Sequence, residues 1–146
     1  MVDAGLTILI IGRDGMDHEH ENHDLIICKS FLPEGEFREC IEYSRILFVP
    51  SVTDASPRVI TEAFCLGTPV LVNENIFGGW KYVNDDTGSF FTDEHDVMEK
   101  IEDIMEKINH DFYHTREWYK HAYFPNGRCL ANDKLKDFVL RIKNGA

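Results

Sequence analysis

The sequence predicts an α/β fold in which a parallel sheet has helices on both faces. Short apolar runs alternate along the chain with segments of helical periodicity. Strand–helix–strand connections of this kind are right-handed and make neighbouring strands parallel. The apolar runs are continuous rather than alternating, as in strands that are covered on both faces. Because no linker or internal repeat divides the chain, we expect residues 1–146 to form a single domain.

Five apolar runs are the expected strands. The first is "LTILIIG", Leu6 to Gly12, and the second is "LIIC", Leu25 to Cys28; both are of the fully buried type. The remaining three are Ile46 to Ser51, Pro69 to Asn73 and Gly88 to Phe91. A polar segment that separates the first two strands is typical of a loop.

Helices are expected between and after these strands. A helix beginning near Pro33 would have Phe37, Cys40, Ile41 and Tyr43 on its apolar side. Residues 94–143 are expected to form the C-terminal helices: an amphipathic helix, an aromatic-rich segment that packs the helices together, and a last helix. Their apolar positions are Val97, Ile101, Ile104, Met105 and Ile108, followed by Leu135, Phe138, Val139 and Ile142.

Ser56, Pro57 and Gly67 bracket a short helix in the positions that these residues prefer. Serine is favoured as the N-cap, proline in the first turn, and glycine just past the C-terminus. The unpaired amides of Arg58 and Val59 and the positive end of the helix dipole would then face the carboxyl end of a strand, where open parallel sheets bind ligands. We expect an anion site there, with diphosphate as a good candidate.

Two carboxylates, Asp54 and Glu62, lie on either side of this helix start. Glu62 falls beside the apolar side of the helix and suits a ribose diol, because a carboxylate accepts hydrogen bonds from two hydroxyls; Asp54 suits sugar hydroxyls. A purely structural interpretation competes: Asp54 makes an Asx turn, and Arg58 and Glu62 form a surface ion pair. Local features alone favour the structural interpretation.

A longer set of ordered motifs runs from Glu36 to Phe91. In order they are Pro50-Ser51, Asp54, Glu62-Ala63, Gly67-Thr68-Pro69-Val70, Gly78-Gly79 and Gly88. The pattern resembles the C-terminal, donor-binding domain of retaining GT-B glycosyltransferases, the group 1 family, and covers about residues 25–105. The resemblance implies a Rossmann-like domain, the C-terminal half of the GT-B fold. It also implies transfer of a sugar from a nucleoside-diphosphate sugar to an acceptor hydroxyl with retention.

The resemblance assigns roles to individual residues. The catalytic pair would be Asp54, which holds the donor-sugar hydroxyls, and Glu62, which binds the ribose. The other donor-binding residues would be Ser51, Ser56, Pro57, Arg58 and Val59 near the helix start, Lys29 and Phe31 near the base, and Gly78 and Gly79. A glycine pair lets the backbone approach a sugar or phosphate closely. No cofactor or metal is implied, because basic residues and the helix dipole stabilise the leaving group in this family.

The sequence departs from the family pattern in three respects. Asp54 is one methylene shorter than the glutamate of the family. The first strand–helix unit, with its basic Arg-and-Lys pair, is missing: "LIIGRDGMD" has Arg13 but no following lysine. Besides Arg13, the residues that could supply this missing positive charge are Lys29, Arg58 and Lys81. Without a preorganised cation, departure of the diphosphate would be slower. The acceptor domain is missing as well.

We therefore expect a donor-binding domain that is part of a larger or split enzyme, with a nucleotide sugar and an acceptor-binding domain or subunit as its partners. The alternative is a noncatalytic module that binds a nucleotide sugar or another protein. Titration of nucleotides followed by an assay of sugar-bond hydrolysis would discriminate the two.

Composition excludes several other classes. A net charge of −11 opposes non-specific binding to nucleic acid and to anionic lipid. No apolar run is long enough for a membrane span and the start lacks a signal peptide, so we expect a cytoplasmic chain. The scattered cysteines fit neither a zinc knuckle nor a disulfide framework. His18, His20 and His23 lie among acids, but their spacing matches no clean ligand pair, so no metal is expected. For Trp80 and Tyr82, packing under a turn is favoured over stacking on a base.

Overall fold

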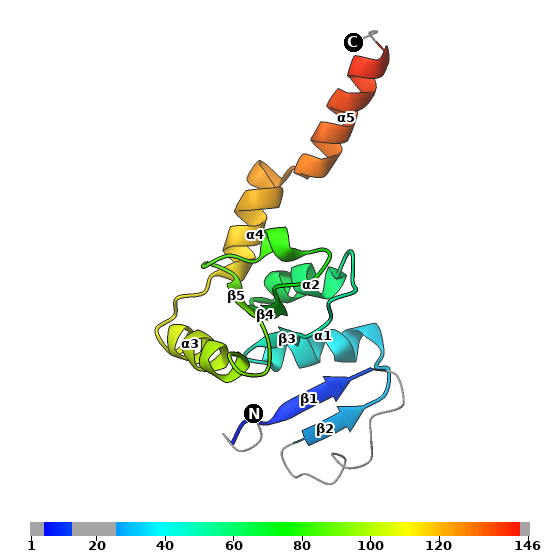
Figure 1. Cartoon of the computed structure of the whole chain (residues 1–146). Helices are drawn as coiled ribbons and strands as arrows, with labels where there is room; N and C mark the ends of the chain where they lie inside the picture. The colour runs from blue at the N-terminus through cyan, green and yellow to red at the C-terminus, as the bar shows by residue number, and fades with distance from the viewer. Residues whose placement is uncertain (1–4, 13–25, 144–146) are drawn as a thin grey trace. The chain divides into compact units, whose positions relative to one another are not determined.

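A computed structural model of the chain describes residues 5–12 and 26–143 (Figure 1). These residues belong to two compact units, Met1–Cys40 and Ile41–Ala146, each of which is described by itself. The polar segment between the first two strands lies outside the described residues.

The first unit contains two parallel strands, β1 (Ile8–Ile11) and β2 (Ile26–Lys29), paired from Ile8 opposite Ile26 to Ile11 opposite Lys29. Their positions agree with the prediction, but the expected full burial is wrong for both strands. Residues of β1 are half-buried, whereas Ile27 of β2 is 44% exposed. Neighbouring strands cover the edges of a strand, whereas its faces are buried only where other elements pack on both sides of the sheet.

Helix α1 (Glu34–Tyr43) begins in the first unit and ends in the second. Ile41 is 3% exposed, as expected for its apolar side. Tyr43 is 85% exposed, so its predicted place on that side is wrong. The helix ends there, in a turn where the amide of Ser44 donates to the carbonyl oxygen of Ile41.

The second unit contains three parallel strands in the order β3 (Leu47–Val49), β4 (Val70–Asn73) and β5 (Gly88–Phe91). Figure 1 shows β4 between the other two. The first three residues of β4 are fully buried, as a central strand of an α/β domain requires. The predicted α/β class with parallel strands is confirmed. Among the described residues the strands form two sheets, because no ladder joins β1 and β2 to the other three.

Helix α2 (Arg58–Leu66) follows β3 and buries Ile60, Ala63 and Phe64 completely. It ends at Gly67, whose φ of 91° is in the left-handed region that glycine adopts without strain. The amide of Thr68 then donates to the carbonyl oxygen of Ala63 at 2.9 Å. The predicted C-terminus of this helix is confirmed.

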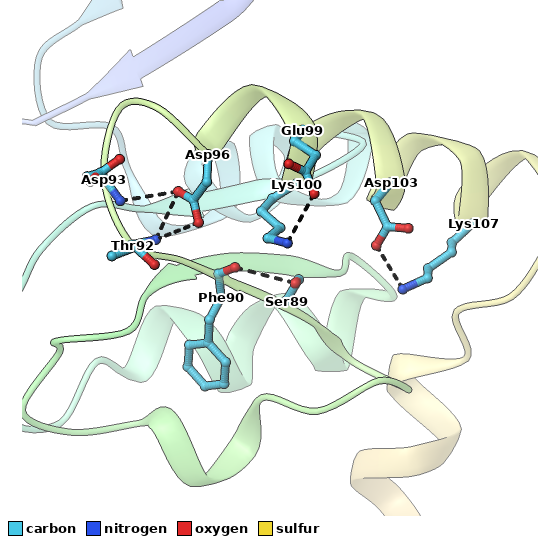
Figure 2. Close-up of polar contacts among 9 residues, drawn as sticks. All are labelled: Ser89, Phe90, Thr92, Asp93, Asp96, Glu99, Lys100, Asp103 and Lys107. Atoms are coloured by element: carbon cyan, nitrogen blue, oxygen red, sulfur yellow. Dashed lines mark hydrogen bonds and ion pairs between the residues drawn. The ribbon is translucent and has the colours of Figure 1, made fainter.

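Helix α3 (Val97–Asn109) is the predicted amphipathic helix, with Val97, Ile101 and Ile104 buried. Asp96 precedes it, and Figure 2 shows the amides that donate to its carboxylate: Thr92 at 3.0 Å and Asp93 at 3.2 Å. These bonds fix the path of the chain between β5 and α3.

Helix α4 (Thr115–Tyr123) packs on α2. Its Arg116 side chain donates to the carbonyl oxygens of Cys65 at 2.8 Å and Leu66 at 3.1 Å, the last residues of α2. The Phe64 ring lies edge-on to Trp118, with centroids 6.1 Å apart. The aromatic segment therefore packs against α2, whereas the prediction was that it packs the C-terminal helices together. A short 3₁₀ turn, η3 (Pro125–Gly127), leads into α5 (Leu130–Lys143), whose predicted apolar face is exposed.

Candidate functional site

The predicted site lies where β3 and β4 end. Two loops leave the sheet there, one leading from β3 into α2 and the other following β4. The amide of Phe77 donates to the carbonyl oxygen of Val52 at 3.2 Å, and the amide of Gly78 donates to that of Asp54 at 3.0 Å. The two loops therefore form one hydrogen-bonded structure at the carboxyl edge of the sheet, where ligands of α/β domains bind.

The start of α2 differs from the prediction in its capping residue. Pro57, not Ser56, directly precedes the first helical residue, and no side chain caps the helix. The amide of Ser56 donates to Oδ1 of Asp54 at 2.8 Å, which forms an Asx turn before the helix. Among the described residues, no protein acceptor covers the amides of Arg58 and Val59.

The two acids differ in surroundings. Asp54 is exposed and makes the Asx turn that the structural interpretation predicted. Glu62 is half-buried on α2. The alternative ion pair between Arg58 and Glu62 is not among the ion pairs of the described part of the chain. The Glu62 carboxylate is therefore not held by its expected cation.

The glycine pair is required by protein contacts. A Cβ at Gly78 would overlap the carbonyl oxygen of Ala55. Gly79 has a φ of 81°, and a Cβ there would lie 2.6 Å from Cγ of Pro57. The close backbone approach that we predicted toward a ligand is thus made toward the loop before α2. Ala55 gave no sequence signal for this contact, because alanine is unremarkable in a loop.

Beside the tip of α2 lies a hollow of about 190 Å³. Trp80 is 58% exposed on its wall, so the packing favoured for this residue from the sequence is wrong. The ring of Tyr82 packs against Tyr123, with centroids 5.4 Å apart, as predicted for that residue. The lining residues are Ala55, Ser56, Gly78, Gly79 and the 3₁₀ turn η2 (Trp80–Tyr82).

Lys81 brings a positive charge to this hollow. Its Nζ lies 4.9 Å from the centroid of the Tyr82 ring, in a cation–π contact. Burial raises the pKa of Tyr123, the charge of Tyr82 adds to that rise, and Lys81 opposes it. Lys81 is thus the one cation among the described groups that act on the pKa of Tyr123.

Comparison with known families decides what this domain is. The model of the family described as "Glycosyl transferases group 1" matches residues 5–123. The chain belongs to this family. The matched range includes the loop before α2, both acids and the glycine pair, and it is longer than the range 25–105 predicted from the motifs. No curated protein matches the chain.

Within this group 1 glycosyltransferase domain, the predicted donor-binding residues fall into three sets. Ser56, Gly78 and Gly79 line the hollow, and Pro57 to Val59 form the adjoining helix start. Ser51, Asp54 and Glu62 do not line it. Lys29 and Phe31 belong to the first unit, where Lys29 ends β2 and Phe31 is 71% exposed in the loop that follows.

A second hollow, of about 290 Å³, lies at the other end of the sheet of the glycosyltransferase domain. It is lined by Arg45, Thr68 and Pro69, which come just before β3 and β4, and by Tyr113. Although it is larger, it is at the amino ends of the strands and contains none of the predicted site residues. Position relative to the sheet therefore favours the hollow at the α2 tip as the donor site.

Among the residues that the structure describes, no group of three or more His, Cys, Asp and Glu side chains could hold a metal ion. His18, His20 and His23 lie outside them. The described helices also include none that is long and apolar enough to cross a bilayer.

Proposed function

We propose that this glycosyltransferase domain binds a nucleoside-diphosphate sugar and takes part in transfer of the sugar to an acceptor hydroxyl with retention of anomeric configuration. The observation that carries the proposal is the family match over residues 5–123, which spans the α2 tip and both acids. The family match supports glycosyl transfer; the donor class and the stereochemistry are part of the proposal.

The diphosphate would bind at the start of α2. The amides of Arg58 and Val59 have no protein acceptor in the described structure, and the helix dipole adds positive potential at this end. The exposed side chain of Arg58 can contribute its charge from the first turn. A diphosphate that gathers negative charge as it leaves is stabilised by donors already in place.

The two acids would hold the two sugars of the donor. Oδ1 of Asp54 already accepts the Ser56 amide, which orients the carboxylate and leaves Oδ2 to accept a sugar hydroxyl. Glu62, one turn into α2 and without its expected ion-pair partner, would accept the two ribose hydroxyls. We propose that donor binding requires no metal or cofactor, because the anion is neutralised by amides and cations.

We further propose that the domain acts as the donor half of a larger or split enzyme, with the acceptor bound by another domain or subunit. The motifs that carry the family resemblance are those of the donor half. A noncatalytic nucleotide-sugar-binding module is the second candidate, and the missing lysine after Arg13 favours it, since that residue supplies leaving-group charge in the family.

The test is calorimetric titration of the full chain with UDP, GDP, UDP-glucose and GDP-mannose in EDTA. Asp54→Asn keeps the Oδ1 acceptor of the Asx turn but removes the charge. Asp93→Asn is its matched control, because Asp93 makes the same turn with the amide of His95 at 2.8 Å. Glu62→Gln is compared with Glu102→Gln, an exposed position on α3.

We expect one nucleotide series to bind, Asp54→Asn and Glu62→Gln to weaken binding about tenfold or more, and both controls to bind like the wild type. The proposed site would be wrong if no nucleotide binds, or if the control variants lose as much nucleotide affinity as Asp54→Asn and Glu62→Gln. Hydrolysis of the bound donor, measured by free sugar release, separates the two candidates. Turnover favours the transferase, and binding without turnover favours the module or the half-enzyme.

A further inference from the structure

Trp80 is a tryptophan that no ring contact explains. Its side chain is 58% exposed, although tryptophan is among the more buried residue types on average. The other tryptophan, Trp118, lies against Phe64 and Tyr123, with ring centroids 6.1 Å apart in each pair. The Trp80 ring makes no such contact with a described residue and lies instead on the wall of the hollow at the α2 tip.

The backbone that carries Trp80 is fixed. The amide of Tyr82 donates to the carbonyl oxygen of Gly79 at 3.0 Å, and the amide of Val83 donates to that of Trp80 at 3.1 Å. Gly79 in turn leaves no room for a Cβ against Pro57. A platform whose backbone is already ordered loses little conformational freedom when a ligand binds.

The hollow also contains polar groups that the protein does not use. Ser56 Oγ, Trp80 Nε1 and Lys81 Nζ belong to lining residues, and none of them has a hydrogen bond or ion pair with a described residue. An aromatic wall with a few unpaired polar groups is the usual lining of a small-molecule site. At about 190 Å³ the hollow is smaller than a typical pocket for a drug-sized ligand, so it suits a single ring.

We propose that this hollow binds one sugar ring, with Trp80 as the surface on which the ring stacks. A pyranose has C–H groups on its faces and hydroxyls around its edge, so it can lie on an indole while its hydroxyls meet polar groups. The hollow is lined by the two residues that follow Asp54, the acid proposed for sugar hydroxyls, and not by Glu62, the acid proposed for ribose. The choice of a sugar over a base therefore rests on the proposed function.

The polar groups disfavour a protein surface as the occupant. A partner that covered the hollow would take the Lys81 ammonium out of water, which is costly unless the partner supplies an acceptor at that point. Phe77, in the same loop, is 74% exposed but does not line the hollow. A covering protein would contact both aromatic side chains, whereas a sugar in the hollow would contact Trp80.

The sugar ring can come from the donor or from the acceptor, and two titrations of the full chain distinguish these sources. The first compares UDP-glucose with UDP, and GDP-mannose with GDP. The second uses methyl glucoside and methyl mannoside, with and without nucleotide. Calorimetry and tryptophan fluorescence follow both. A donor sugar gives tighter binding of the sugar nucleotide than of its nucleotide, and an acceptor sugar gives binding of a methyl glycoside.

We expect Trp80→Ala to weaken binding of the sugar about tenfold and to leave the affinity for the bare nucleotide unchanged. Trp80→Phe should keep part of the sugar affinity, because a phenyl ring still stacks. Phe77→Ala is the matched control and should bind like the wild type. The fluorescence change caused by the sugar should persist in Trp118→Phe and disappear in Trp80→Phe. Melting temperatures check that each variant is folded.

Three results would overturn the proposal. The first is a wild-type chain that binds no sugar nucleotide more tightly than its nucleotide and binds no methyl glycoside. The second is equal weakening of nucleotide and sugar nucleotide by Trp80→Ala, which would make the base the stacked ring. The third is an equal loss in Phe77→Ala. Failure of the proposed function looks different: no nucleotide binds, while methyl glycosides still change the fluorescence of Trp80.

Discussion

The backbone amide of Gly78 donates a 3.0 Å hydrogen bond to the carbonyl oxygen of Asp54, so the turn after β4 is tied to the residue that precedes the α2 tip. At the same position the missing side chain of Gly78 makes room for the carbonyl of Ala55. The shape of the candidate donor site therefore depends on a glycine that belongs to a different loop from the acid.

Gly78→Ala should destabilise the domain by about 2–4 kcal/mol, because the new methyl group overlaps backbone that can move only if both loops shift. Urea unfolding measures the change. Gly35→Ala is the control: its Cβ would meet nothing within 4 Å in α1, and we expect unchanged or slightly higher stability. Equal effects of the two substitutions would contradict the contact with Ala55.

Arg116→Ala should lower stability by about 1–2 kcal/mol, because it removes two hydrogen bonds to the negative end of the α2 dipole. Arg116→Lys should recover only part of this, since an ammonium does not reproduce the fork of donors. Arg38→Ala, which breaks an exposed ion pair with Glu34, should cost less than about 0.5 kcal/mol. Thermal unfolding of the three variants gives the comparison.

Asp96 should make stability depend on pH in the acid range. Loss of hydration acts to raise its pKa, but the amides of Thr92 and Asp93 outweigh it and hold the pKa below the ordinary 3.8. A carboxyl group with a lowered folded pKa contributes stability that is present above the unfolded pKa and disappears as pH falls through the folded value.

The measurement is the melting temperature of the wild type and of Asp96→Asn between about pH 6 and about pH 2.5. The difference in melting temperature between the wild type and Asp96→Asn should be largest above pH 4 and should disappear in more acid solution. Asp86→Asn, at another exposed acid of the second unit, is the control. A gap that stays constant with pH would refute the role of the charge.

Tyr113→Phe should leave stability unchanged or raise it by up to about 1 kcal/mol. The hydroxyl of Tyr113 is buried and has no hydrogen-bond partner among the described residues, and burial raises its pKa. Removing an unsatisfied polar atom removes a desolvation cost. Tyr43→Phe, at a side chain that is 85% exposed, should be neutral. A clear loss of stability in Tyr113→Phe would mean that an ordered water satisfies the hydroxyl.

The sequence was most informative where local chemistry determines structure. The fifth strand was predicted at its observed bounds, Gly88–Phe91, and the apolar spacing identified the buried side of α3. Gly67 ended α2 as predicted, because a left-handed C-terminal residue is a local requirement that glycine meets. These features depend on neighbours within a few positions.

Prediction was weaker where distant parts of the chain meet. The apolar run of β2 predicted burial, but burial depends on what covers a strand, and the sequence does not contain that information locally. The absence of the first strand–helix unit of the family stays a prediction from the motifs.

The candidate site was predicted in part. The helix start, the glycine pair and the surrounding loops are brought together, whereas the predicted cap at Ser56 was wrong because the helix starts one residue later, after Pro57, which has no side-chain acceptor. The contact of Ala55 with Gly78 and the exposure of Trp80 depend on how two loops meet, which no periodicity encodes. The roles of Asp54 and Glu62 stay predictions.

The contacts of α4 with the end of α2 have a consequence for biosynthesis. Arg116 is about fifty positions after the carbonyl groups that it binds, so α2 lacks these bonds until that residue has left the ribosome. A nascent chain that stops before α4 would have α2 without the two hydrogen bonds that hold its C-terminal end. We therefore expect nucleotide capture to arise late in synthesis, after the sheet itself has formed.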